Sequence, residues 1–168
     1  MMQVFSFVNQ KGGCGKTTAA VNLAGALAAR GRRVLLVDLD PQGHATMGLG
    51  CDPGDEPTSL EVLAGTCDIQ SVITSAPGGI DLIPADLRLA EFEERAEHTL
   101  RPEQALSFAL RGLEERYDFV LLDCPPRADG VLTINALRAS DTAILVVETG
   151  AFALQGAVKA LSIFEEIR

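Results

Sequence analysis

Short runs of apolar residues alternate along this chain with longer segments in which apolar residues recur every three or four positions. The apolar runs predict strands over residues 2–8, 33–39, 79–84, 119–123 and 143–148. The helical spacing predicts helices over residues 17–30, 59–64, 69–74, 86–97, 102–116, 130–139 and 154–167. Residues 41–57 carry three prolines and four glycines, which predicts a loop.

This alternation predicts an α/β fold, a doubly wound and mostly parallel sheet with helices on both of its faces. The runs at 33–39 and 119–123 are almost wholly apolar, and each contains an acidic residue at or near its end. Such a run is typical of a strand that is buried on both faces of a parallel sheet. Right-handed crossovers are expected between the parallel strands.

The composition narrows the class of protein. The 168 residues are 47% hydrophobic, which excludes a disordered chain and is enough for one core. No stretch reaches the ~18 consecutive apolar residues of a membrane span, and no basic residue precedes the first apolar run, unlike a secretory signal. We therefore expect residues 1–168 to form a single cytoplasmic domain that does not bind a membrane.

The net charge of −9 is unevenly distributed. Residues 1–40 hold five basic and two acidic residues, whereas residues 41–123 hold five basic and sixteen acidic ones. An overall basic surface for nucleic acid is excluded, although a local one is not. The acidic middle of the chain is interpreted as a solvated face.

The cysteines and histidines show no spacing typical of metal ligands. Cys14, Cys51, Cys67 and Cys124 form no C-x-x-C pair, so free thiols are expected. The two histidines, at positions 44 and 98, are isolated and are interpreted as surface residues.

The segment VNQKGGCGKTT lies between the first predicted strand and the first predicted helix. A glycine-rich loop there points backbone N–H groups into one concavity at the positive end of a helix dipole, which suits a polyphosphate. Lys16 would reach the β- and γ-phosphates, and the Thr17 hydroxyl would bind Mg²⁺. The residues expected to bind the nucleotide are Lys11, Gly12, Gly13, Cys14, Gly15, Lys16, Thr17 and Thr18.

Two related motifs fail at single positions. The ordinary phosphate loop G-x-x-x-x-G-K-[ST] needs glycine where Gln10 stands, and the dinucleotide motif G-x-G-x-x-G needs glycine where Thr18 stands. The pattern that matches is K-G-G-x-G-K-[ST], in which a second lysine, Lys11, opens the loop.

Five segments together resemble the ParA/MinD family of deviant Walker ATPases. They are KGGCGKTT at 11–18, VDLDPQG at 37–43, SLEVL at 59–63, DLIPA at 81–85 and YDFVLLDCPP at 117–126. The form Asp40-Pro41-Gln42-Gly43 is similar to the ParA/Soj branch, and the amphipathic membrane helix that ends MinD-like proteins is not found. The resemblance implies a P-loop NTPase fold with ATP and Mg²⁺ as ligands.

Acidic residues are expected at the edge of the sheet where the strands end, which is where ligands of open parallel sheets bind. A carboxylate there can orient the water that attacks a phosphoryl group. The resemblance implies that Asp40 has this hydrolytic role and that Asp38 orders the Mg²⁺ shell through water or the dimer interface. It places Asp123 at the Walker B position, where it would hold Mg²⁺ through a water while Thr17 binds directly.

The resemblance also implies that Lys11 reaches across an ATP-dependent homodimer to the partner's nucleotide. The expected catalytic residues are Lys11, Lys16 and Asp40, and the expected switch loops contain Asp40, Pro41, Gln42, Gly43, Pro125 and Pro126. A cation supplied in trans stabilises the transferring phosphoryl group, as arginine fingers do.

The leading hypothesis is an ATPase that partitions plasmid or chromosomal DNA. Its ATP-bound dimers would bind DNA non-specifically, and a partner protein of the ParB type would stimulate their slow hydrolysis. Arg30, Arg32 and Arg33 form the basic cluster of the chain, and relatives carry DNA-contacting residues and further strands beyond the point that matches Arg168. We therefore expect the chain to be an N-terminal portion of the family fold.

Two alternatives use the same loop. One is an ATP-dependent positioning or assembly factor for a protein cargo, which would bind a cargo adaptor instead of DNA. The other is an iron–sulphur reductase of the nitrogenase iron-protein type, which needs bridging cysteines between subunits. Cys124, directly after Asp123, does not match that placement.

Overall fold

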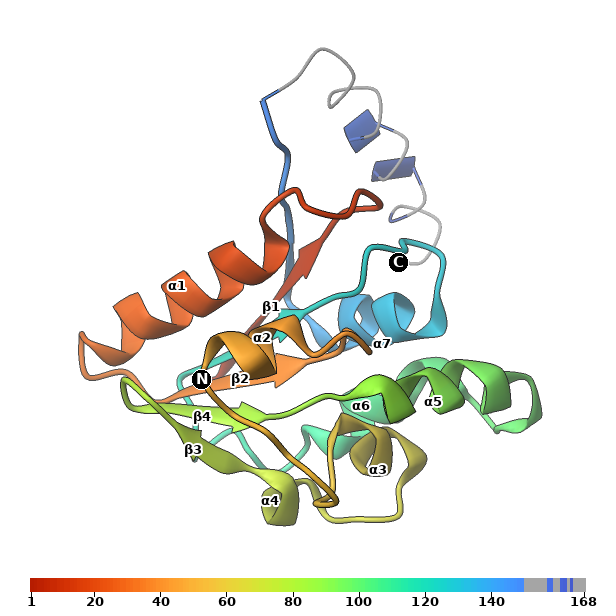
Figure 1. The fold of residues 1–168 in the computed structure, drawn as a ribbon, viewed down its shortest axis with the longest axis horizontal. Coiled ribbons are helices and arrows are strands. Elements are labelled where there is room, and N and C mark those ends of the chain that lie inside the picture. Colours follow the sequence, from red (N-terminus) through yellow and green to blue (C-terminus); the bar gives the residue numbers. More distant parts are fainter. Residues whose placement is uncertain (150–156, 159–160, 163, 165–168) are drawn as a thin grey trace.

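A six-stranded sheet forms the centre of the computed structural model, which describes residues 1–149, 157, 158, 161, 162 and 164 (Figure 1). Its strands are β1 (Gln3–Val8), β2 (Val34–Asp38), β3 (Thr74–Ala76), β4 (Ile80–Ile83), β5 (Phe119–Asp123) and β6 (Thr142–Leu145). Their order is β3-β4-β2-β5-β1-β6, and every pairing is parallel except that of β3 with β4. The predicted mostly parallel sheet is confirmed.

Helices cover both faces of this sheet. The α-helices are α1 (Lys16–Ala28), α2 (His44–Gly48), α3 (Ser59–Ala64), α4 (Ile69–Val72), α5 (Ala90–Arg95), α6 (Ala105–Ala109) and α7 (Val131–Ala139). Three 3₁₀ turns are η1 (Leu87–Leu89), η2 (Ala96–His98) and η3 (Pro102–Gln104). Residues of α1 and α2 pack on one face, and residues of α3 to α7 pack on the other.

The apolar strands supply both cores because their side chains alternate between the two faces. In β2, Leu35 and Val37 belong to the core under α3 and α7, whereas Leu36 belongs to the core under α1. Small residues on α1, Ala20 and Ala24, are fully buried and let this helix approach the sheet closely. Each strand leucine that is buried in one of these two cores stabilises the fold by about 2 kcal/mol.

The register of the central strands brings their carboxyl ends together. Asp38 at the end of β2 is paired with Asp123 at the end of β5, and Phe7 of β1 is paired with Asp123 from the other side. The loops that follow these three strands therefore leave the sheet side by side. They contain the phosphate loop, residues 39–43 and residues 124–130.

The structure corrects three predicted boundaries. Residues 41–57 are not wholly loop, because α2 lies within them. The helix predicted over 69–74 ends at Val72, and Thr74 begins the short strand β3, in agreement with the extended backbone of its β-branched neighbour Ile73. The strand predicted over 143–148 is β6, which ends at Leu145.

The predicted helices in the acidic middle are shorter than expected. The helix over 86–97 is divided into η1, α5 and η2. The helix over 102–116 consists of η3 and α6 and ends at Ala109, shortly before Gly112, which has a φ of +89°. The closing helix predicted over 154–167 lies largely outside the described residues. In the part of the chain that is described, no helix is long and apolar enough to cross a membrane.

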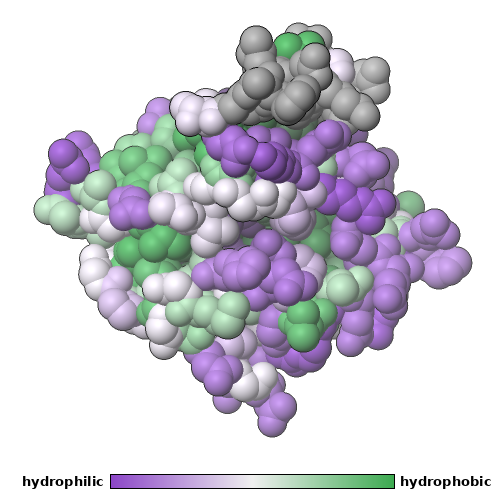
Figure 2. All heavy atoms as spheres, turned by 45° about the horizontal axis from the view of Figure 1, so that its top comes forward, coloured by the Kyte–Doolittle hydropathy of each residue, from purple (hydrophilic) through white to green (hydrophobic). Residues whose placement is uncertain are grey.

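Hydrophilic residues cover most of the right side of the face shown in Figure 2, the side on which α5 lies in Figure 1. Hydrophobic surface gathers on the left side, where α1 lies. The glutamates of α5 contribute to the hydrophilic side, since this helix has only one buried residue, Phe92. This distribution agrees with the interpretation of the acidic middle as a solvated face.

A prediction about stability concerns Gly43, the N-cap residue of α2. It has a φ of +61°, and a Cβ added there would lie 2.8 Å from the Ala85 carbonyl oxygen. Gly43→Ala should therefore lower the free energy of unfolding by about 3–4 kcal/mol, through backbone strain and the clash together. Gly50→Ala is the matched control, because φ is +71° but no atom lies within 4 Å of the added Cβ. Gly50→Ala should lower the free energy of unfolding, measured in urea, by about 1–2 kcal/mol. Equal losses in the two variants would contradict the clash at Gly43.

Candidate functional site: a phosphate loop beside three buried carboxylates

The phosphate loop connects β1 to α1 and leaves the start of α1 without a protein cap. Gly15 is the N-cap residue, with a φ of +95°, and it has no side chain to accept from the first-turn N–H groups. The first turn of α1 also contains no acidic residue. These N–H groups and the positive end of the helix dipole are therefore available to an anion, as the sequence predicted.

Lys16 lies almost completely inside this loop. The residue is 6% exposed, and its Nζ donates to the Lys11 carbonyl oxygen at 3.3 Å. Among the described residues no carboxylate forms an ion pair with this ammonium. The charge of Lys16 lowers the pKa of the nearby Asp123, but a buried cation without a direct ion pair is costly, which favours a negatively charged group beside it.

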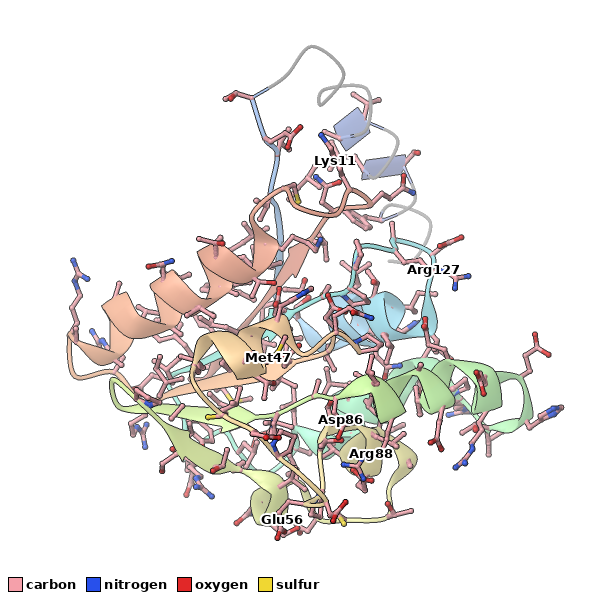
Figure 3. The ribbon with its side chains drawn as sticks, viewed as in Figure 1. Lys11, Met47, Glu56, Asp86, Arg88 and Arg127 are labelled. Atoms are coloured by element: carbon pink, nitrogen blue, oxygen red, sulfur yellow. The ribbon has the colours of Figure 1, made fainter. Side chains whose placement is uncertain are left out.

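Lys11 lies at the mouth of the loop, at the top of Figure 3. Its side chain is 58% exposed and forms an ion pair with Glu148, which follows β6. Asn9 holds the same segments together, because its Oδ1 accepts from the Lys11 N–H at 3.1 Å and its Nδ2 donates to the Val146 carbonyl oxygen at 2.6 Å. Sequence reasoning missed Asn9 and Glu148, whose contacts depend on β6 lying beside β1.

Asp123 is buried at the end of β5, and neither of its carboxylate oxygens has a hydrogen-bond partner at bonding geometry among the described residues. Burial is the main cause that raises the pKa of Asp123 to about 7. The nearby Thr17 hydroxyl lowers this pKa, whereas the charges of Asp38 and Asp40 raise it. An unpartnered carboxylate beside a hydroxyl and two more acids fits a hydrated Mg²⁺ ion, which prefers oxygen ligands and keeps several of its waters.

The raised pKa of Asp123 predicts a pH dependence of stability. The folded chain keeps a proton on Asp123 that the unfolded chain releases near pH 4, so stability falls as the pH rises from about 4 to about 7. Asp123→Asn removes this loss. The free energy of unfolding of Asp123→Asn, relative to that of the wild type, should rise by on the order of 2–4 kcal/mol between pH 4 and pH 8.

Urea unfolding at several pH values, with EDTA and without nucleotide, measures this difference. The exposed carboxylate of Asp129, whose one ion pair within the described part of the chain is with Arg127, provides the control variant Asp129→Asn. Its curve should run parallel to that of the wild type. Parallel curves for Asp123→Asn and the wild type would contradict a buried, protonated Asp123.

Asp38 has both carboxylate oxygens occupied by protein donors. Its Oδ1 accepts from the Asp40 N–H at 3.0 Å, and its Oδ2 accepts from the N–H and the hydroxyl of Thr46 at 2.9 and 2.8 Å. Burial raises the pKa of Asp38 to about 6, against these hydrogen bonds. The Thr46 hydroxyl also accepts from the Ala85 N–H at 3.0 Å, so Asp38 links the end of β2 to α2 and to the end of β4. In this arrangement it positions the loop that carries Asp40.

Asp40 lies at the start of this loop and is 6% exposed. Its Oδ1 accepts from the Gln42 N–H at 2.9 Å, and its Oδ2 lies 3.7 Å from Nδ1 of His44, on the first turn of α2. Oδ2 therefore has no close donor among the described residues. His44 is exposed, as expected, but its position beside Asp40 could not be predicted from the sequence.

The loop after β5 lies against the phosphate loop. A Cβ added to Gly12 would lie 3.9 Å from Cβ of Pro126, and Pro125 is buried while Pro126 is exposed. Burial raises the pKa of the Cys124 thiol well above its ordinary value, so this cysteine is not a nucleophile. All four cysteines are free, as predicted.

The structure thus brings together most of the predicted site residues at one edge of the sheet. Cys14 is buried in the loop, Thr17 is half-buried beside Asp123, and Thr18 is exposed on the far side of the first turn. Pro41 and Gln42 lie on the rim of the Asp40 loop. Sequence reasoning missed Thr46, because it lies in the stretch predicted to be loop.

A parallel sheet with this loop, these strand-end acids and the second lysine defines a P-loop protein of the deviant Walker type. The AAA domain family model matches residues 2–168, and the chain belongs to this family of ParA/MinD-type P-loop ATPases. Over 158 residues the chain is 43% identical to the sporulation initiation inhibitor protein Soj of Bacillus subtilis. Over 172 residues it is 41% identical to the chromosome partitioning protein ParA of Caulobacter vibrioides.

These alignments cover 93% and 99% of this chain but 62% and 64% of the two relatives, so the chain spans about three fifths of their length. A solved structure is similar over 99% of this chain and 68% of its own, with 39% identity and a TM-score of 0.94. It is cobyrinic acid a,c-diamide synthase of Mycobacterium smegmatis with bound ADP and magnesium.

Proposed function

We propose that this chain is the nucleotide-binding part of a ParA-like ATPase that binds ATP with Mg²⁺ and hydrolyses it to ADP and phosphate. One observation carries the proposal: the buried, unpartnered carboxylate of Asp123 lies beside Thr17 and the uncapped start of α1. The ADP and magnesium bound by the similar synthase support it. The identity with Soj and ParA favours this reading over other P-loop enzymes.

Each residue of the site has a role in this reaction. The first-turn N–H groups and the Lys16 ammonium bind the phosphates, and Lys16 stabilises the charge that develops on the transferring group. The Thr17 hydroxyl binds Mg²⁺ directly, and Asp123 binds it through water. Mg²⁺ neutralises charge on the β- and γ-phosphates. Asp40 uses its free Oδ2 to orient the attacking water, and Asp38 holds the Asp40 loop in place.

Dimerisation and the cellular role are further parts of the proposal. ATP brings two chains together, Lys11 crosses to the partner's nucleotide, and a partner of the ParB type stimulates hydrolysis. The exposure of Lys11 and its position at the mouth of the loop support this. DNA partitioning is the role favoured by the names of the two relatives.

A positioning role for a protein cargo is the second candidate, because the basic cluster is partly neutralised. Arg33 donates from Nη2 to Oδ1 of Asp118 at 2.9 Å, and this ion pair lowers the pKa of Asp118 to about 2. The remaining cations of the cluster, Arg30 and Arg32, offer few contacts to DNA phosphates, and the chain as a whole has a net charge of −9. Strong DNA binding by this cluster is therefore not favoured. The iron–sulphur alternative is not proposed, because Cys124 is too deeply buried to bridge two subunits.

The test measures ATP turnover with and without DNA, together with light scattering in ATP and in ADP. The ATPase proposal predicts phosphate release that requires Mg²⁺ and a doubling of mass only in ATP. A DNA mobility shift that needs ATP and weakens steeply with salt supports partitioning. Turnover and dimers without any shift support the cargo role, and the absence of turnover in the whole natural protein would refute the ATPase.

A further inference from the structure

A second concave site lies away from the phosphate loop. It is a groove of ≈ 550 Å³ between α3 and α4 on one side and residues 99–111, which include η3 and α6, on the other. In Figure 1, α3 and α4 lie at the bottom of the molecule, whereas the phosphate loop after β1 lies at the top. None of the groove's lining residues belongs to the nucleotide site.

The groove has an apolar floor and an apolar rim. Val62 and Leu63 of α3 and Ile69 of α4 form the floor and are buried. The rim carries Leu100, which is 91% exposed, and Phe108, which is 46% exposed. Its size lies within the range of about 300–1,000 Å³ that ligand sites occupy. Exposed leucine and phenylalanine beside a groove are features of interaction surfaces rather than of solvated faces.

The charges at the groove differ from those of the surrounding surface. Of the five basic residues between 41 and 123, three lie within ion-pair distance of carboxylates, namely Arg88, Arg95 and Arg116. Figure 3 shows Arg88 beside Asp86 in the lower part of the molecule. The other two, Arg101 and Arg111, both line the groove, and no ion pair involves either of them among the described residues.

An aromatic contact holds Arg111 at the rim of the groove, and Arg101 has an unusual backbone conformation. The Arg111 guanidinium carbon lies 4.5 Å from the centre of the Phe108 ring, so the cation covers an apolar part of the rim. Arg101 has a φ of +51°, and it is the one residue other than glycine with a positive φ in the described part of the chain. The third charged residue of the lining, Asp68, is engaged elsewhere, because its carboxylate accepts from the Gln70 N–H and caps α4.

We propose that this groove binds an amphipathic, acidic segment of another protein. Apolar side chains of that segment fill the space between α3 and α6 and cover Leu100 and Phe108. Its carboxylates pair with Arg101 and Arg111, the two arginines of this acidic stretch that have no ion pair among the described residues. Arginine and aromatic side chains are among the residue types that carry most of the energy at protein interfaces.

Selection from a random peptide library tests both the site and the chemistry of its occupant. The chain is immobilised without nucleotide, and binders to the variant Leu100→Ser are removed first. The proposal predicts enrichment of peptides that combine Leu, Phe or Met with Asp or Glu. A synthetic copy of the best peptide should bind at least ten-fold more weakly to Arg101→Asn/Arg111→Gln, since asparagine tolerates the backbone of position 101. Arg30→Gln, a change on the far side of the sheet, should leave its affinity unchanged.

Two further measurements test the groove in the unmodified chain. A photo-reactive form of the peptide should cross-link to residues 62–69 or 99–111 of the unmodified chain, whatever the folding of the variants. Its affinity should be the same with and without ATP and Mg²⁺, so the result is independent of the ATPase proposal. Enrichment of basic peptides, cross-links elsewhere, or a nucleotide-free dimer that Leu100→Ser abolishes would each overturn it.

Discussion

Asp40→Ala should lower ATP turnover by a factor of at least ~10², while ATP binding and the ATP-dependent dimer persist. The physical reason is the geometry of the Asp40 loop. One carboxylate oxygen accepts from the Gln42 N–H, and Oδ2, 3.7 Å from Nδ1 of His44, has no close donor among the described residues and can orient a water. The binding groups for the phosphates, the first turn of α1 and Lys16, belong to other segments. Loss of turnover without loss of affinity is therefore expected.

Single-turnover phosphate release and titration with a fluorescent ATP analogue measure the two quantities separately. His44→Ala is the matched control, because His44 lies 3.7 Å from Asp40 on the same loop and helix. It should alter turnover only slightly, whereas a loop disturbed by any substitution would affect both variants alike. Turnover of Asp40→Ala at the wild-type rate would refute the hydrolytic role.

Lys11→Ala should abolish the ATP-dependent dimer and lower turnover by about 10³-fold, which is the lower end of the effect of an arginine finger. Binding of ATP to the monomer should change little, since the buried Lys16 remains. Light scattering in ATP measures the dimer, and equilibrium dialysis measures monomer binding. The result depends on a lysine side chain that is 58% exposed and therefore able to reach another molecule.

Glu148→Gln distinguishes this role from a simple surface ion pair. Glu148 is the residue that pairs with Lys11 within the same chain. If the ion pair only stabilised the loop, both variants would show the same loss. If Lys11 acts in the partner's site, Glu148→Gln frees it and should leave dimerisation equal to or stronger than that of the wild type. If Lys11→Ala formed dimers at the same ATP concentration as the wild type, the role of Lys11 in the partner's site would be contradicted.

The central strands could be predicted from the sequence because burial on both faces leaves a continuous apolar run. For β2 and β5 the observed strands lie within the predicted ranges. The phosphate loop could be predicted for a similar reason, since close approach to phosphate restricts several neighbouring positions to glycine and lysine. Local constraints of this kind are visible in a single sequence.

Features that depend on tertiary contacts could not be predicted. The five residues of α2 have weak helical preference and follow a proline and a glycine, and Thr46 is held by Asp38 and by Ala85, which are distant in the sequence. The partnership of Lys11 with Glu148 and the groove beside Arg101 likewise arise only when remote segments meet. The family resemblance singled out Asp38 and Asp40 but did not show that both carboxylate oxygens of Asp38 accept hydrogen bonds from Asp40 and Thr46.

The uncapped start of α1 makes the stability of the fold a function of occupancy. A serine, threonine, aspartate or asparagine at the N-cap stabilises a helix by about 1 kcal/mol, and α1, which begins after Gly15, has no such cap. In the proposed function a bound polyphosphate takes the place of this cap at the start of α1, the longest described helix. Through this linkage each tenfold excess of nucleotide over its dissociation constant adds about 1.4 kcal/mol to the unfolding free energy. The melting temperature of the chain is thus a readout of its nucleotide state.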